Sequence, residues 1–147
     1  MAHTYATIFV HLVFSTKERA ALIPAEKLGS LWAYVMGIAR NHGVIPIAVG
    51  GTPNHLHALI QLPATMSVAD AANKLKSNSS RWMSGHGPRF AWQEGYGAFS
   101  VSPSQVESVK EYVANQAEHH KRRDFEEEFV ALLKNCGVDY DPKYVFG

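Results

Sequence analysis

The sequence predicts an α+β fold in which a mainly antiparallel sheet is flanked by helices, in a ferredoxin-like arrangement. Short segments rich in β-branched and aromatic residues alternate with segments of helical periodicity, in the order β–α–β–β–α–β–α–α. The turn GTPN joins the second and third strands, which favours a hairpin. The 147 residues suit one domain, 1–147, and contain no internal repeat or linker.

The first four elements follow from local composition. Ala6–Ser15 is a predicted strand because most of its residues are β-branched or aromatic. Ala25–Asn41 is a predicted helix, since its apolar residues recur at the spacing of one helix face and a glycine follows. Val44–Gly50 is a short strand that includes Pro46, which is typical of an edge or a bulge. Asn54–Leu62 is the strand that completes the hairpin.

The second half of the sequence predicts three helices and one strand. Ser67–Trp82 is a predicted helix, because serine is a preferred N-cap and an acidic residue follows three positions later. The segment GAFSVSP is the fourth strand, after a glycine-rich loop. Ser104–His120 is a second capped helix, in which Ser104 and Glu107 form a capping box. Phe125–Asn135 is the last helix, which Gly137 ends, and the tail after it is expected to be extended.

The composition is that of an ordinary globular protein, with 46% hydrophobic and 18% charged residues. The single cysteine, Cys136, excludes an intrachain disulfide and fits a reducing compartment. The N-terminal apolar stretch lacks a basic leader and is interpreted as a strand, so we expect a cytoplasmic protein without membrane association. The net charge of +1 does not favour a nucleic-acid partner, so that case depends on local clusters of cations.

The stretch PNHLHALIQLP places His55 and His57 one residue apart in a predicted strand. Alternate residues of a strand project to one face, and a rise of about 3.3 Å per residue separates their Cα atoms by about 6–7 Å. Two imidazoles at this spacing can share a metal ion. For an arbitrary pair, a solvated sheet face is the commoner outcome, so the metal interpretation requires a third ligand.

The segment VESVKEYVANQAEHH contains a candidate third ligand and a candidate nucleophile. Tyr112 and Gln116 are four residues apart, so they share a helix face. A tyrosine oxygen can act as a covalent nucleophile, and a glutamine carbonyl is a hard oxygen ligand suited to Mg²⁺ or Mn²⁺. The alternative is a half-buried tyrosine beside a solvated glutamine, and periodicity does not decide between the two.

Together these motifs resemble the HUH-type single-tyrosine transposases of small bacterial insertion sequences, a group that includes the REP-associated tyrosine transposases. The resemblance extends over nearly the whole chain, in the family's order, through HLVFSTKER, PNHLHALIQLP, KLKSNSSRWM, WQEGYGAFSVSPSQ and EYVANQAEHHKRRDFEEEFVALLKNCGVDYDPKYVF. It implies a sheet flanked by helices in a bacterial, homodimeric protein that acts on single-stranded DNA containing a hairpin. An active site within one chain and one shared across the dimer are both compatible with the sequence.

The resemblance also implies a mechanism. His55, His57 and Gln116 match the family's ligands for a divalent metal, Mg²⁺ or Mn²⁺, and Tyr112 matches the nucleophile that attacks the scissile phosphate. The product would be a 5′-phosphotyrosine link and a free 3′-OH, which can later attack that link and rejoin strands. The phosphotyrosine stores the bond energy and the sequence contains no Walker-type loop, so no nucleotide cofactor is expected.

Clustered cations are candidate contacts for DNA phosphates. They lie on two segments and are Lys74, Lys76, Arg81, Lys121, Arg122 and Arg123. Ser79 and Ser80 could add hydrogen bonds to the DNA. The acidic run Glu126–Glu128 is interpreted as a solvated helix face away from the DNA, and His11 has no partner at metal-binding spacing.

Three other functions compete with the transposase interpretation. A histidine-triad nucleotide hydrolase also has a His-hydrophobic-His strand, but Leu59 and Gln61 stand where that family uses further histidines. A catalytically silent, domesticated protein that binds single-stranded DNA hairpins on the same fold is the second. A structural domain without a nucleic-acid role is the third. The presence of Tyr112, Gln116 and both histidines favours the active enzyme.

Overall fold

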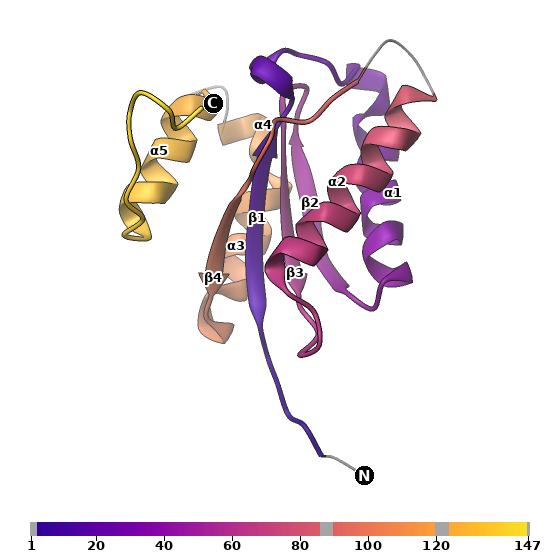
Figure 1. Cartoon of the computed structure of the whole chain (residues 1–147), viewed down its shortest axis with the longest axis vertical. Coiled ribbons are helices and arrows are strands. Elements are labelled where there is room, and N and C mark those ends of the chain that lie inside the picture. The colour runs from indigo at the N-terminus through magenta and orange to yellow at the C-terminus, as the bar shows by residue number, and fades with distance from the viewer. Residues whose placement is uncertain (1–2, 86–89, 120–123, 147) are drawn as a thin grey trace.

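A four-stranded antiparallel sheet is the centre of the computed structural model, which describes residues 3–85, 90–119 and 124–146 (Figure 1). Its strands are β1 (Phe9–Ser15), β2 (Ile45–Thr52), β3 (His55–Gln61) and β4 (Gly97–Val101), in the spatial order β2–β3–β1–β4. Every pairing is antiparallel, and β1 lies between β3 and β4. With one helix in each crossover, this order is the predicted ferredoxin-like arrangement.

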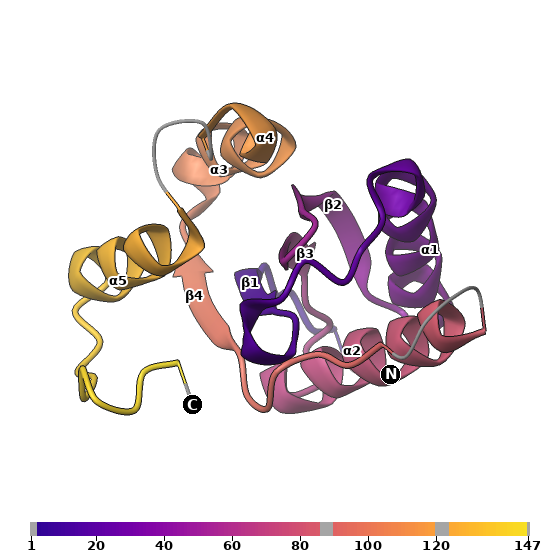
Figure 2. The same ribbon diagram turned by 90° about the horizontal axis from the view of Figure 1, so that it is seen from above.

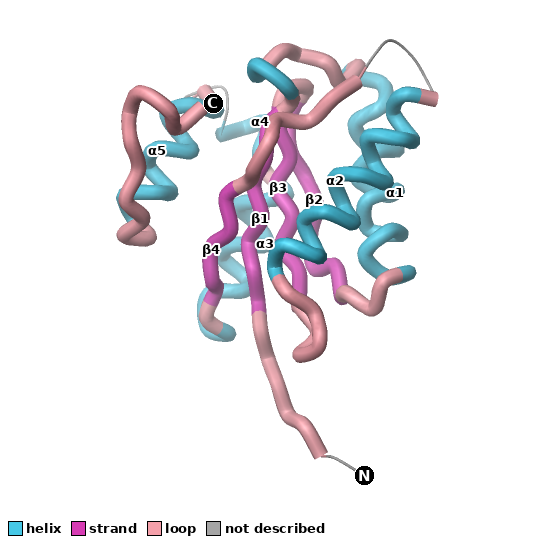
Figure 3. Tube along the Cα trace, viewed as in Figure 1, coloured by secondary structure: helices cyan, strands magenta, loops and turns pink. Residues whose placement is uncertain are grey.

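Helices cover both faces of the sheet (Figure 2). On one face lie α1 (Leu28–Asn41) and α2 (Val68–Ser84); on the other lie α3 (Val106–Ala114), the single turn α4 (Gln116–His119) and α5 (Phe125–Asn135). The tract after α5 folds back beside that helix (Figure 3). None of the helices within the described ranges is long and apolar enough to span a membrane.

Strand alternation separates the buried side chains into two clusters. The larger cluster faces α1 and α2 and includes Leu12 and Phe14 of β1 and Leu56 of β3. The smaller cluster joins Val13 and Phe99 of the sheet to the α5 residues Phe125, Phe129 and Leu133. The side chains of β3 that alternate with Leu56 therefore face α3 and α5.

Several local predictions are confirmed. The Ser67 hydroxyl accepts a hydrogen bond from the Asp70 amide at 3.0 Å, as expected of the cap of α2. The bounds of α5 are those predicted, and the carboxylate of Asp124 caps it at the Glu127 amide. The register of β2 shifts after Pro46, where a bulge was expected. A 3₁₀ turn precedes α1, so the α-helix begins at Leu28.

Three local predictions are wrong. Ser104 does not cap α3, because the 3₁₀ turn Pro103–Gln105 leads into the helix, with the proline at its first position. The predicted helix does not continue beyond residue 114 but breaks at Asn115, whose φ of −103° and ψ of 28° are not helical. The tail is turned instead of extended, since two amides donate to the Asp141 carbonyl.

Candidate active site

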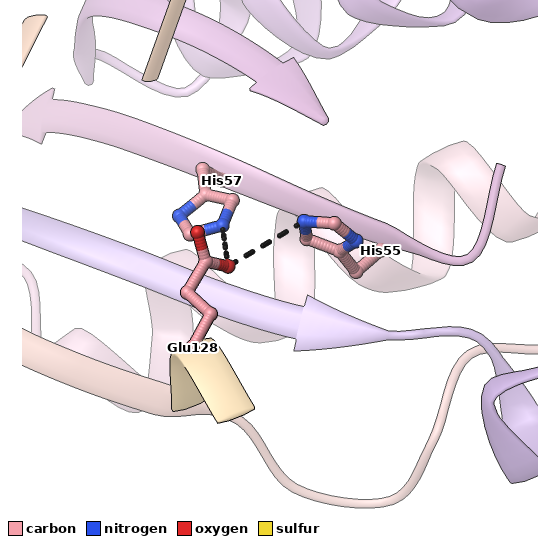
Figure 4. Close-up of side chains that lie close together, drawn as sticks. All are labelled: His55, His57 and Glu128. Carbon is pink, nitrogen blue, oxygen red and sulfur yellow. Dashed lines mark hydrogen bonds and ion pairs between the residues drawn. The ribbon is translucent and has the colours of Figure 1, made fainter. Parts of the chain in front are cut away.

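His55 and His57 project from β3 onto the face covered by α3 and α5 (Figure 4). Their ring centroids lie 5.1 Å apart, which confirms the predicted placement on one face. Both side chains are fully buried, so the alternative of a solvated sheet face is excluded.

Each of the two histidines is held through its Nδ1 atom, which leaves Nε2 directed into the site. Nδ1 of His57 lies 2.7 Å from Nε2 of His11. Nδ1 of His55 lies 2.9 Å from both Thr52 Oγ1 and Asn54 Oδ1. Metal-binding histidines are characteristically held by a hydrogen bond at the second ring nitrogen, which orients the ring and selects its tautomer. The two side chains therefore have the arrangement expected of preoriented ligands.

Tyr112 at the end of α3 and Gln116 at the start of α4 lie beside the histidines of the same chain. Gln116 is buried, and its Oε1 atom lies 3.1 Å from Nε2 of His55. Its Nε2 donates to the Tyr112 carbonyl at 3.1 Å. The half-buried Tyr112 ring lies 5.7 Å from the ring of His57. The structure thus brings together all four residues that the sequence predicted for the centre.

Glu128 on α5 is a further member of this cluster, which was not predicted from the sequence. It is 2% exposed, and its Oε1 lies 2.8 Å from Nε2 of His57 and 3.6 Å from Nε2 of His55 (Figure 4). Its Oε2 accepts a hydrogen bond from the Tyr112 hydroxyl. The prediction of a solvated acidic face is wrong for Glu128, because it lies one turn after the buried Phe125 and on the same helix face. The three-residue spacing from Phe125 to Glu128 was the signal in the sequence that Glu128 is buried.

A metal ion could be held by this cluster. One donor atom each from His55, His57 and Glu128 lie within 4.8 Å of one another. Gln116 adds an amide oxygen next to His55. Two imidazole nitrogens with carboxylate and amide oxygens form a donor set typical of divalent metals.

His11 on β1 is the buried hydrogen-bond partner of His57, a contact that the spacing of histidines along the sequence did not indicate. In the antiparallel register His11 lies opposite Leu59, which places it diagonally from His57 on the same face. Burial lowers the pKa of His11 to about 3, with a further lowering by His57 that Glu128 opposes. His11 is therefore neutral at neutral pH and can accept a hydrogen bond from its partner.

The predicted DNA-contacting cations differ in their surroundings. Lys74 and Arg81 are exposed on α2, on the face of the sheet opposite the histidines. Lys76 is half-buried, and its ammonium donates to the carbonyls of Gln93 and Gly95, at 2.7 Å each. Burial also lowers the pKa of Lys76. The remaining three, Lys121, Arg122 and Arg123, lie outside the described residues.

Residues 4–116 match the family model of the Y1 transposases, described as IS200-like transposases. The chain belongs to this family. As an IS200-like transposase, it is a DNA-binding protein of transposition. The match ends at Gln116, so α5 and Glu128 lie beyond the matched segment.

Known relatives agree with this assignment. The ISDra2 transposase TnpA of Deinococcus radiodurans is 24% identical over 114 residues, which cover 72% of this chain and 81% of that protein. The crystal structure of a candidate transposase from Deinococcus radiodurans R1 has a TM-score of 0.63 at 22% identity, over 79% of this chain and 95% of the other. A REP-associated tyrosine transposase bound to a REP hairpin has a TM-score of 0.57 at 12% identity, over 77% of this chain and 68% of the other. The two structures share the fold of this transposase.

Proposed function

We propose that this transposase cleaves and rejoins single-stranded DNA through a 5′-phosphotyrosine intermediate on Tyr112. His55, His57 and Gln116 would hold the divalent ion, Mg²⁺ or Mn²⁺. The observation that supports this most is the approach of Gln116 Oε1 to within 3.1 Å of His55 Nε2, while the Nε2 atom of the same side chain donates to the Tyr112 carbonyl. These residues come from one chain, so the proposal does not require the active site to be shared with a second subunit.

The chemistry follows from the groups present. The Tyr112 oxygen attacks the scissile phosphorus, an O–P bond forms, and the bond to the 3′ oxygen breaks. A bound divalent ion would neutralise charge on the phosphate oxygens and orient the phosphorus. The hydrogen bonds at Nδ1 of His55 and His57 keep their Nε2 atoms directed into the site. Attack of the 3′-OH on the phosphotyrosine reverses the step and rejoins strands.

The proposed substrate is single-stranded DNA with a hairpin. The REP-associated relative was solved on a REP hairpin, which supports this class of substrate. Lys74 and Arg81 lie on the face opposite the histidines, so they would contact DNA away from the cleaved phosphate. Contacts by Lys76 and by the segment Lys121–Arg123, a homodimer and a cytoplasmic location stay predictions.

The test uses labelled single-stranded DNA from the flank of the encoding gene, with its hairpin. The protein is incubated with this DNA and Mg²⁺ or Mn²⁺, and a denaturing gel is scored for a covalent adduct. We expect an adduct in the wild type, none without metal, and none for Tyr112→Phe. Tyr96→Phe, at an exposed tyrosine, is the matched control and should retain the adduct.

Two results would contradict the assignment. An undiminished adduct in Tyr112→Phe would exclude that residue as the nucleophile. Unchanged metal dependence in His57→Ala would exclude the histidine pair as the metal site. Tight hairpin binding without any adduct would instead favour the catalytically silent hairpin-binding protein.

A further inference from the structure

Glu128 contacts both parts of the proposed centre, one with each carboxylate oxygen. Oε1 lies 2.8 Å from Nε2 of His57 and 3.6 Å from Nε2 of His55. Oε2 accepts the hydrogen bond of the Tyr112 hydroxyl. The side chain is 3% exposed, so these contacts are made away from bulk water.

We propose that Glu128 is a catalytic residue with two roles. Oε1 is a ligand of the metal, and Oε2 receives the phenol proton when Tyr112 attacks. The proposal rests on the proposed cleavage chemistry, and it adds to the centre a helix that the matched family segment does not include.

The distances agree with a shared ion. Octahedral coordination at about 2.1 Å places neighbouring ligand atoms about 3.0 Å apart. The atom pairs His57 Nε2–Glu128 Oε1, His55 Nε2–Gln116 Oε1 and His55 Nε2–Glu128 Oε1 measure 2.8, 3.1 and 3.6 Å. The first two values are close to that spacing and the third is larger, so a bound ion would draw His55 and Glu128 closer together. Four protein ligands would leave two positions for water or phosphate oxygens.

The charge of the ligand set also favours a carboxylate. Two neutral imidazoles and an amide supply no negative charge, whereas Mg²⁺ and Mn²⁺ favour carboxylate oxygens. Glu128 supplies one negative charge at a buried position next to both histidines. With a divalent ion bound, the centre would retain a net positive charge and attract the phosphate.

The second oxygen meets a requirement of the nucleophile. A tyrosine hydroxyl has a pKa of about 10 in isolation, so it attacks phosphorus well only if its proton is removed. As the O–P bond forms, the phenol proton passes along the existing hydrogen bond to Glu128 Oε2. The P–O3′ bond breaks, and the leaving 3′ oxygen takes a proton from water. In the rejoining step the attacking 3′-OH releases its proton to water, and Oε2 returns the stored proton to the leaving tyrosine oxygen.

A carboxylate in this position could instead obstruct the site by repelling the phosphate. The two roles predict opposite effects on the cleavage rate when the carboxylate is removed. Removing a ligand and proton acceptor weakens metal binding and slows cleavage, whereas removing an obstruction accelerates cleavage.

The first measurement is metal binding without DNA. Mn²⁺ is titrated into the wild type, Glu128→Gln and Glu127→Gln, and free Mn²⁺ is followed by electron paramagnetic resonance. Glutamine keeps the shape of Glu128 but not its charge, and circular dichroism verifies the fold. We expect Glu128→Gln to bind Mn²⁺ about 10-fold more weakly or worse. Glu127→Gln, at the exposed neighbouring residue, is the control and should bind Mn²⁺ as the wild type does. Equal affinity in Glu128→Gln would overturn the ligand role.

The second measurement is the rate of adduct formation at saturating Mn²⁺. We expect Glu128→Gln to be slower by about 10²–10⁴-fold, the usual contribution of a proton acceptor. A fluorinated tyrosine at position 112 has a more acidic phenol and depends less on a proton acceptor. It should therefore increase the rate of Glu128→Gln by a larger factor than the rate of the wild type. An unchanged rate in Glu128→Gln, or a faster one in Glu128→Ala, would overturn the proton-acceptor role. A wild type that binds Mn²⁺ through Glu128 but forms no adduct would refute the cleavage chemistry and leave the ligand role standing.

Discussion

Nε2 of His11 lies 2.7 Å from Nδ1 of His57, and the two buried rings are stacked with centroids 5.0 Å apart. For Nε2 of His57 to bind a metal, its ring proton must be on Nδ1. That N–H then donates to Nε2 of His11, which must be neutral to accept. Burial stabilises the neutral form of His11, because it lowers the pKa to about 3. His11 is therefore a positioning residue for the proposed metal site.

Replacing His11 with phenylalanine should weaken Mn²⁺ binding. The ring volume is kept but the acceptor for His57 Nδ1 is lost, and loss of such a partner costs about 10–100-fold in metal affinity. His11→Gln, whose amide oxygen can accept, should recover part of the affinity. The measurement is a Mn²⁺ titration by electron paramagnetic resonance, with the exposed His42→Gln as the control. Wild-type affinity in His11→Phe would show that His57 is oriented without His11.

The same histidine should make stability depend on pH. The pKa of His11 is about 3 in the folded chain and near the ordinary 6.5 when unfolded. Between these values the unfolded chain binds a proton that the folded chain does not, so the free energy of unfolding falls as pH is lowered from 6.5 toward 3. One proton contributes a slope of up to about 1.4 kcal/mol per pH unit. Urea unfolding at several pH values without metal should show a shallower slope for His11→Phe, and equal slopes would contradict this prediction.

The fold was predictable because its signals are local and agree with one another. The cap at Ser67, the proline in β2 and the apolar periodicity of α5 each specify an element from neighbouring residues. Alternation along β3 also placed His55 and His57 on one face without knowledge of the partners.

The partners of the histidines could not be predicted in the same way. His57 is 46 residues from His11 and 71 residues from Glu128 along the chain. Periodicity tells which face a side chain shares, but not which helix covers that face. The three glutamates of α5 form one acidic run in the sequence, although only Glu128 is in phase with the buried Phe125. The break at Asn115 leads into α4, which contacts β2, and no neighbouring residue in the sequence indicates that contact.

Gly50 of β2 allows the close approach of α3 that positions Tyr112. A Cβ atom at this position would lie 2.3 Å from the main-chain oxygen of Val113. Gly50→Ala must therefore move α3 away from the sheet, and we expect a loss of about 1–3 kcal/mol in stability and a slower formation of the covalent adduct. Gly37→Ala in α1 is the control, because no atom outside its own helix backbone lies within 4 Å of its Cβ position. That change should stabilise the helix by about 0.5–1 kcal/mol. Thermal unfolding and the adduct assay test both variants, and equal behaviour of the two would refute the steric argument.

Ser79 on α2 was a candidate DNA contact, but its burial leads us to expect that it stabilises the core instead. It is fully buried, and its Oγ accepts a hydrogen bond from Trp92 Nε1 at 2.9 Å while donating to the Leu75 carbonyl. Ser79→Ala removes the acceptor of a buried indole N–H, which should cost about 1–3 kcal/mol in urea unfolding. The neighbouring Ser80 is partly exposed, and Ser80→Ala should change stability by less than about 0.5 kcal/mol. Under conditions in which both variants are folded, Ser79→Ala should bind the DNA hairpin with the affinity of the wild type. Weaker binding by Ser79→Ala at unchanged stability would instead assign this hydroxyl to the DNA.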